Sequence, residues 1–297
     1  MPTLLDFRRR IRSVKNTQQI TRAMKFIAAA RLRKAQEGVM AARPYAREIL
    51  RILRSAVTRI EEPMHPLLER RPEESILVIV MTGDRGLAGP FNANVLRYAT
   101  TFLREQASKK IRVMAIGKKG RDVLRKRNYG FAGEYLNVSL NVDFSKAKEI
   151  GAKIVELYSA REVDAVYVIY NEFKSVIVQR LCAQKLLPIE PEVLKGPEAQ
   201  KGKEATGEAT PVDYIYEEPP AEIFKHLVLR YIDTEVFRIL LESAAAEHGA
   251  RMAAMDSATN NAGELITELT LEMNKIRQAG ITRELIEIVS GASSSAE

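Results

Sequence analysis

The sequence of 297 residues is poor in the residue types that build disulfide or metal-bound frameworks. It has one cysteine, Cys182, no tryptophan, and three scattered histidines, His65, His226 and His248. A single cysteine excludes a disulfide within the chain and is typical of a reducing compartment. Because no second soft ligand lies close to any of the histidines, we expect no zinc site and no cofactor.

Long apolar runs and an N-terminal targeting segment are also lacking. No stretch approaches the roughly 20 apolar residues that a membrane-spanning helix needs. The chain starts with Met-Pro-Thr, and the apolar core of a signal peptide does not follow. The sequence therefore predicts a soluble protein, or one that is held at a membrane only by its partners.

Positive charge is abundant. The chain has 46 Lys and Arg against 38 Asp and Glu, a net charge of +8, and such a balance favours anionic partners. The first 34 residues contain ten basic residues and one acid, Asp6. This segment lacks the interleaved aromatic residues of many nucleic-acid sites. A nucleic-acid-binding coiled-coil protein remains an alternative, which binding at physiological salt would favour.

Residues 1–60 predict one long coiled-coil helix. Apolar or small residues recur there with alternating spacings of three and four, which is typical of a coiled-coil seam. The two sets of seam positions are Ile11, Gln18, Lys25, Leu32, Val39, Ala46, Leu53 and Ile60, and Val14, Thr21, Ala28, Ala35, Ala42, Ile49 and Ala56. Alanine dominates the second set, so we expect a partner helix to approach closely. Pro44 lies off the seam and is expected to bend the helix locally.

Residues 220–290 predict a second long helix, since no proline follows Pro220. Its apolar stripe is Leu227, Leu241, Ala245, Met252, Met255, Ala262, Ile266, Leu269, Met273 and Ile276. Neither terminal helix can bury its stripe alone. We therefore expect the two helices to form an antiparallel coiled coil within the chain.

Residues 73–215 predict a Rossmann-like α/β domain. Strands expected at 76–81, 111–116 and 165–170 alternate with helices expected at 92–106, from Gly120, and at 143–158. This alternation indicates a largely parallel sheet with helices on both faces. A strand at 175–186 follows after only a few residues, so it is expected to run antiparallel.

Two segments predict irregular structure. Residues 61–72 hold three prolines and predict a linker, and residues 190–212, rich in Pro, Glu, Lys and Gly, predict a mobile loop. The predicted fold class is an α/β domain plus a long antiparallel coiled coil formed by the N- and C-terminal helices.

The glycine-containing segment from Thr82 to Asn92 follows a strand and precedes a helix, where α/β proteins bind phosphates. It matches neither the Walker nor the dinucleotide-binding pattern, which favours a structural turn. Gly117–Gly120 gives an equally weak phosphate signal. A small α/β enzyme with helical arms is thus a second alternative, which nucleotide binding by the isolated chain would support.

The rest of the sequence shows no catalytic set. No carboxylate pair, nucleophile with its base, or metal set is recognisable, and Cys182 is expected to be a buried structural thiol. The sequence therefore predicts a component of an assembly and no enzyme.

Six segments resemble the gamma subunit of bacterial F-type ATP synthases. They are RSVKNTQQITRAMK (12–25), AAARLRKAQ (28–36), DRGLAGPFN (84–92), EHGARMAAMDSATNNA (247–262), NKIRQAGIT (274–282) and EIVSGA (287–292). The segments cover both ends and the start of the middle domain, and thus effectively the whole chain. The resemblance implies a non-catalytic rotor shaft that couples proton flow through a membrane ring to conformational cycling of the catalytic beta subunits.

The resemblance also implies partners and contact residues. A single copy would stand in a ring of alpha and beta subunits, with the epsilon subunit and the membrane c-ring, at the cytoplasmic face of the bacterial cell membrane; nucleic acid is not implied. The implied residues are Met24, Lys25, Arg277, Gln278 and Thr282 for beta contacts, Ile286, Ile288 and Val289 for an apolar bearing, and Tyr214 and Glu217 for the epsilon subunit and the ring.

Overall fold

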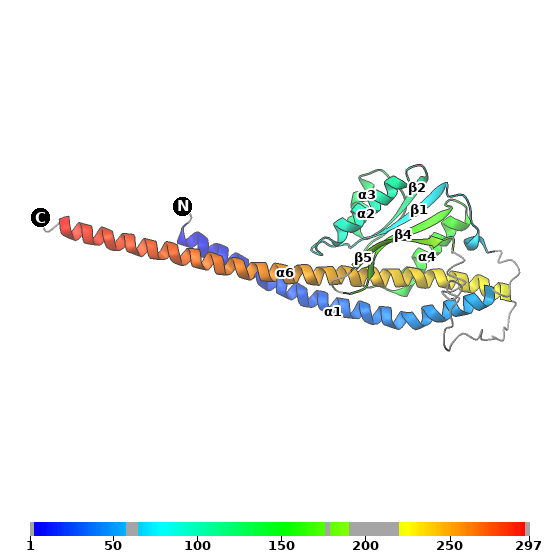
Figure 1. The fold of residues 1–297 in the computed structure, drawn as a ribbon, viewed down its shortest axis with the longest axis horizontal. Helices are drawn as coiled ribbons and strands as arrows, with labels where there is room; N and C mark the ends of the chain where they lie inside the picture. The colour runs from blue at the N-terminus through cyan, green and yellow to red at the C-terminus, as the bar shows by residue number, and fades with distance from the viewer. Residues whose placement is uncertain (1–2, 58–64, 176–178, 190–219, 295–297) are drawn as a thin grey trace, which may run out of the picture. The chain divides into compact units, whose positions relative to one another are not determined.

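The computed structural model describes residues 3–57, 65–175, 179–189 and 220–294. Its elements, labelled in Figure 1 where space allows, are α1 (Leu4–Val57), η1 (Pro66–Leu68), β1 (Ser75–Met81), α2 (Phe91–Glu105), β2 (Lys110–Ile116), α3 (Lys118–Arg125), β3 (Gly130–Tyr135), α4 (Phe144–Ser159), β4 (Ala165–Phe173), β5 (Gln179–Leu187) and α6 (Pro220–Ser294). The chain divides into two compact units. The first joins Met1–Ala29 with Arg251–Glu297, and the second is Ala30–Ala250.

The second unit contains a five-stranded sheet in the order β3-β2-β1-β4-β5. β1, β2, β3 and β4 run parallel, and β5 pairs antiparallel with β4. The central strand β1 is buried on both faces because apolar residues fill every position from Ile76 to Met81. Alternate residues of a strand point to opposite faces, so this continuous run supplies two cores.

The first core lies under α2 and α3. It combines Ile76, Val78 and Val80 of β1 with Val95 of α2 and Leu124 of α3, all fully buried. The amphipathic helices α2 and α3 thus cover one face of the sheet with their apolar sides.

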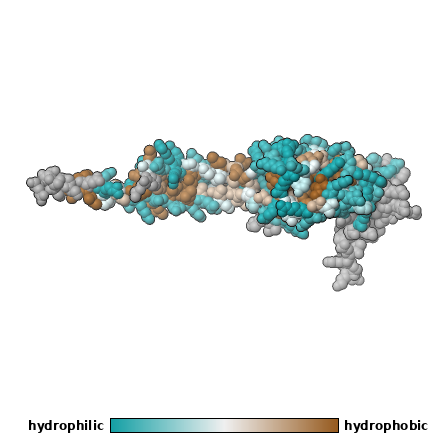
Figure 2. Space-filling view, turned by 90° about the horizontal axis from the view of Figure 1, so that it is seen from above, coloured by the Kyte–Doolittle hydropathy of each residue, from teal (hydrophilic) through white to brown (hydrophobic). Residues whose placement is uncertain are grey.

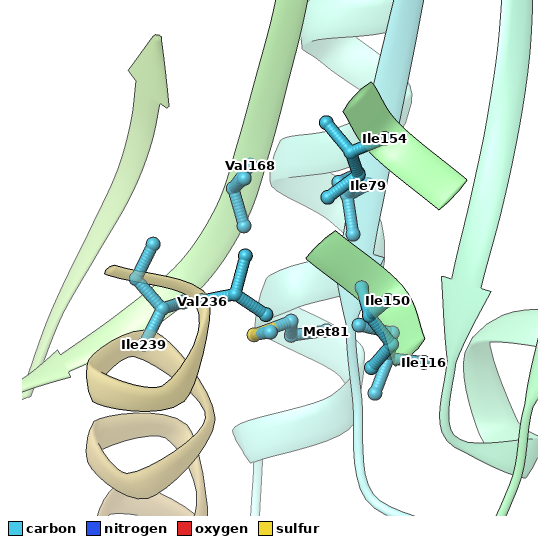
Figure 3. A pocket seen from close by; sticks show the side chains of 8 residues that line it. All are labelled: Ile79, Met81, Ile116, Ile150, Ile154, Val168, Val236 and Ile239. Carbon is cyan, nitrogen blue, oxygen red and sulfur yellow. The ribbon is translucent and has the colours of Figure 1, made fainter. Parts of the chain in front are cut away.

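The second core lies on the opposite face and is larger. Figure 3 shows its centre, where sheet residues, α4 and α6 converge on a space of about 10 Å³. The lining side chains are Ile79, Met81, Ile116, Ile150, Ile154, Val168, Val236 and Ile239. Ile49 and Leu53 of α1 belong to the same core, so both terminal helices take part in covering this face.

The helix and strand predictions for the second unit are confirmed to within a few residues, with one omission. The sequence GFAGEY of β3 was not expected to form a strand, because it contains two glycines and no apolar run. β3 lies at one edge of the sheet and is half-buried or exposed along its length. Pairing with β2, and not its own composition, keeps this segment extended.

The sequence predicted a buried thiol at Cys182, but this thiol is half-buried. The reason is that β5, which carries it, lies at the other edge of the sheet. Its Sγ donates to the carbonyl oxygen of Tyr170 at 3.7 Å. Burial raises the pKa of the Cys182 thiol.

Several expectations fall outside the described residues. These are the loop at 190–212 and the first four residues, 61–64, of the expected linker at 61–72; the described part of that linker, residues 65–72, includes η1. The domain limits 1–60, 73–215 and 220–290 stay predictions.

Pro44 lies inside α1, and the helix continues through it. Among the described residues, no helix combines the length and apolar content needed to cross a membrane.

Gly117, which joins β2 to α3, is confined by backbone atoms. Its φ is +96°, and a Cβ built there would lie 2.0 Å from the carbonyl oxygen of Thr82. Gly117→Ala is therefore expected to lower the free energy of unfolding by about 2–4 kcal/mol, measured by urea unfolding. Gly130→Ala is the matched control, since a Cβ there meets no atom within 4 Å. Equal stability of the two variants would contradict this account.

Candidate interaction surface of the paired helices

In the first unit, α1 and α6 pair in antiparallel orientation. Gln18 Nε2 donates to the carbonyl oxygen of Thr259 at 3.3 Å, and Lys25 Nζ lies 2.6 Å from Asp256 Oδ1. As the residue number rises along α1, the number of the α6 partner falls. The antiparallel coiled coil expected from the two apolar stripes is confirmed within this unit.

Small residues let the two backbones approach closely. Ala28 is 1% exposed and Ala262 is 8% exposed. A Cβ added at Gly263 would lie 3.1 Å from the side-chain amide nitrogen of Gln18. Thr21 and Thr259 share a hydroxyl–hydroxyl hydrogen bond of 2.8 Å. The seam therefore mixes alanine packing with short polar contacts.

The seam positions predicted on both helices are confirmed wherever side chains are described. Each of them is buried or half-buried, and none is exposed. Ile60 and the side chain of Ala56 lie outside the described residues. The 3-4 spacing thus identified the contact faces of α1 and α6 correctly in each unit.

Met24 and Lys25 were expected to face an acidic partner loop, and both lie half-buried on α1. The Lys25 ammonium is already paired with Asp256, and both side chains stay accessible to solvent, 37% and 47% exposed. An ion pair at such a position contributes little to stability, so Lys25 can exchange partners at low cost.

Arg277, Gln278 and Thr282 are exposed near the C-terminal end of α6. The apolar side chains beyond residue 280 are exposed as well, at Ile281, Leu285, Ile286, Ile288 and Val289. In Figure 1, α6 extends beyond the N-terminal end of α1, so α1 does not cover the last turns of α6. Hydrophobic surface on this part of the chain is visible in Figure 2. The last turns of α6 thus present an apolar surface.

Tyr214 and Glu217, expected to meet another subunit, lie outside the described residues.

The glycine-containing turn after β1 is filled by its own hydrogen bonds. Lys118 N donates to Asp84 Oδ1 at 3.0 Å, and Gly120 N donates to Thr82 Oγ1 at 2.8 Å. Gly83 N donates to Asn92 Oδ1 at 2.8 Å. A phosphate bound at this turn would need these amide N–H groups as donors, but each of them already donates to an acceptor within the protein. The geometry favours the structural interpretation of the turn.

A buried charged cluster on α6 was not anticipated. Arg238 forms ion pairs with Glu235 at 2.7 Å and Glu242 at 2.8 Å, and it donates to Gln184 Oε1 at 3.1 Å. Gln184 Oε1 also accepts from the Tyr170 hydroxyl at 3.0 Å. The available sequence signal was three charged residues at helical spacing beside apolar core positions.

The pKa values in this cluster reflect burial and mutual attraction. Burial outweighs the attraction of Arg238 and raises the pKa of Glu242. Burial alone would lower the pKa of Arg238, but the carboxylates beside it raise that pKa. The cluster connects α6 to β4 and β5, and nothing in its geometry suggests catalysis.

No group of three or more His, Cys, Asp or Glu residues that could hold a metal ion occurs in the part of the chain that the structure describes.

Comparisons with known proteins give matches along nearly the whole chain. A family model described as ATP synthase matches residues 3–294. The ATP synthase gamma chain of Solibacter usitatus is 49% identical over 297 residues, covering 98% of this chain and 99% of that relative. The gamma chain of Pelotomaculum thermopropionicum is 45% identical over 292 residues, with coverage of 98% and 99%.

A solved structure has a similar fold. One chain in the mitochondrial ATP synthase of Euglena gracilis, in a structure of OSCP, F1 and c-ring in rotational state 3, matches with a TM-score of 0.65. The match covers 98% of this chain and 94% of that chain, at 19% identity.

Because the helices pair closely, a larger side chain at position 28 is expected to destabilise the pair. Ala28→Leu adds three carbon atoms where the side chain is 1% exposed, so the helices must separate locally, at a cost of about 1–3 kcal/mol. We expect amide hydrogen exchange in residues 10–29 and 251–270 to accelerate by about tenfold. Ala23→Leu, on an exposed position, is the control. Unchanged exchange in Ala28→Leu would show that the seam is not closely packed.

Proposed function

The chain belongs to the family of ATP synthase gamma chains, and we propose that, as the central shaft of a bacterial F-type ATP synthase, it transmits torque without catalysing any step itself. The observation that carries this proposal is the 49% identity to a gamma chain over 98% of the chain. The paired terminal helices and the exposed apolar end of α6 support it. The relatives do not support the nucleic-acid alternative.

Coupling by a shaft requires asymmetry and stiffness. Two paired helices resist twisting better than a single helix. One coil inside a ring of alternating alpha and beta subunits presents a different side to each beta subunit. Each catalytic site then has a different neighbour and a different nucleotide affinity, and rotation exchanges these states through differential contact.

The beta contacts are assigned to Met24, Lys25, Arg277, Gln278 and Thr282. These side chains are exposed or half-buried, and three of them are a lysine, an arginine and an amide that can donate to carboxylates. Attraction between exposed charges is screened by salt and is readily reversed. Contacts that must break at each rotational step need this property.

The bearing is assigned to Ile286, Ile288 and Val289, which are 59%, 67% and 64% exposed. Together with Ile281 and Leu285 they place apolar side chains along an arc of about 160°, nearly half of the circumference of α6, because successive residues are separated by about 100°. An apolar collar would remove this surface from water. If the collar is apolar all round, this broad apolar arc can contact it at every angle, so the helix end can turn in it without a strongly preferred orientation.

The remaining partners are the epsilon subunit and the membrane c-ring, with Tyr214 and Glu217 as contact residues. The protein would then be peripheral to the cytoplasmic face of the bacterial cell membrane, in one copy per complex, and would couple proton flow to ATP synthesis. The α/β unit serves as the base through which the ring applies torque.

Co-expression with the alpha and beta subunits of the same organism tests the assignment. We expect a complex that contains three alpha, three beta and one copy of this chain, by native mass spectrometry. A chain that stays outside the complex, or joins it with another stoichiometry, would refute the proposed function.

Met24→Lys tests the contact assignment. An added cation at this half-buried position would hold a beta-subunit carboxylate through a charge-assisted hydrogen bond, so release at each step would slow. ATP-driven proton pumping is expected to fall several-fold relative to ATP hydrolysis, while assembly is preserved. Ala23→Lys adds the same charge at a neighbouring exposed position and should pump normally. Normal coupled pumping by Met24→Lys would refute this role of Met24.

A further inference from the structure

A groove of about 340 Å³ runs along the outer side of α2, on the face of the sheet opposite to α6. Three arginines line it, Arg97 and Arg104 from α2 and Arg127 from the segment after α3. Thr100 and Leu96 are among the other lining residues. The groove is separate from the helix pair, the glycine-containing turn and the residues assigned to subunit contacts.

The three guanidinium groups follow one line. Arg97 and Arg104 are seven residues apart, so they lie on the same side of α2, two turns and about 10 Å apart. Arg127 donates through Nη1 to Thr100 Oγ1, which places its guanidinium between the other two along the helix. The line of positive charge is therefore continuous over the length of the groove.

These arginines have no carboxylate partner among the described residues. Within the described ranges, Arg97 donates to the side-chain amide oxygen of Asn94 at 3.1 Å. Neither Arg104 nor Arg127 forms an ion pair in that part of the chain, whereas the nearby Arg125 pairs with Glu134. Like charges held this close repel one another, so a bound anion would relieve an unfavourable arrangement.

The surrounding sequence strengthens the positive field. Residues 91–130 contain eleven Lys and Arg against two acids, Glu105 and Asp122. Glu105 follows Arg104 directly, and adjacent residues on a helix do not face each other. Asp122 pairs with Arg121. The acids of this segment thus leave the groove positive.

We propose that this groove binds a phosphate-bearing small molecule, with a diphosphate or triphosphate chain along Arg97, Arg127 and Arg104. Several negative charges in a row match several guanidinium groups in a row, and planar guanidinium groups bind phosphate oxygens in bidentate fashion. The volume is within the range of small-molecule sites. Leu96 and Ala93, which also line the groove, give it an apolar part that can contact a nucleoside. The inference rests on the groove alone and does not depend on the proposed function.

Isothermal titration calorimetry of the full chain at physiological salt, with pyrophosphate, ADP and ATP in turn, tests this proposal. We expect one site per chain and a submillimolar Kd, weakened about tenfold by Arg104→Gln or by Arg127→Gln. Lys110→Gln, which removes one exposed positive charge outside the groove lining, should bind as the unaltered chain does. Tighter binding of ADP than of pyrophosphate would show that the groove also contacts the nucleoside. Equal binding would show that it recognises the phosphate chain alone.

Two results would overturn the proposal. One is the absence of saturable binding of all three ligands to the unaltered chain. The other is an equal loss of affinity in Lys110→Gln and in the arginine variants, since attraction by general surface charge would then explain the binding. Circular dichroism melting of each variant shows whether a loss of binding reflects unfolding.

Discussion

Mutual burial of two apolar stripes is the constraint on which the rest of the structure depends. Each stripe on α1 and α6 is one-sided, and neither helix is stable in water with that side exposed. In the first unit, the stripes are buried against each other. In the second unit, part of α1 and α6 also covers the sheet. One pair of helices therefore supplies both an interaction surface and half of a domain core.

The sequence predicted the contact faces well because spacing determines them. Residues such as Ala28, Leu32 and Ala35 recur at intervals that only a helix places on one side, and all three are buried. The partner of each residue could not be predicted in this way. Pairing of Lys25 with Asp256 depends on the axial register of two helices 231 residues apart in sequence, and small side chains such as alanine leave that register weakly specified.

The candidate site residues came from the family resemblance and not from the spacing of apolar residues. Ile288, one of them, is exposed, and its role as a bearing residue stays a proposal. Arg238, Glu235 and Glu242 have the composition of a solvated helix side, yet both glutamates are buried and the half-buried Arg238 bonds to Gln184 of β5. Helical periodicity cannot show that two charged residues will pair with each other in the interior of the protein. The strand β3 escaped prediction for a related reason, since its neighbour determines its conformation.

The bonds from Arg238 have a consequence for the rotational setting of α6 about its own axis. Rotating or sliding this helix by a single residue would move the guanidinium away from Gln184 and leave charges inside the protein without partners. Apolar side chains that slide past one another oppose such a movement only weakly. Charged groups that lose their partners in the interior cost several kcal/mol. The cluster therefore fixes the angular position of α6 against the sheet, so that a turning force on one must move the other.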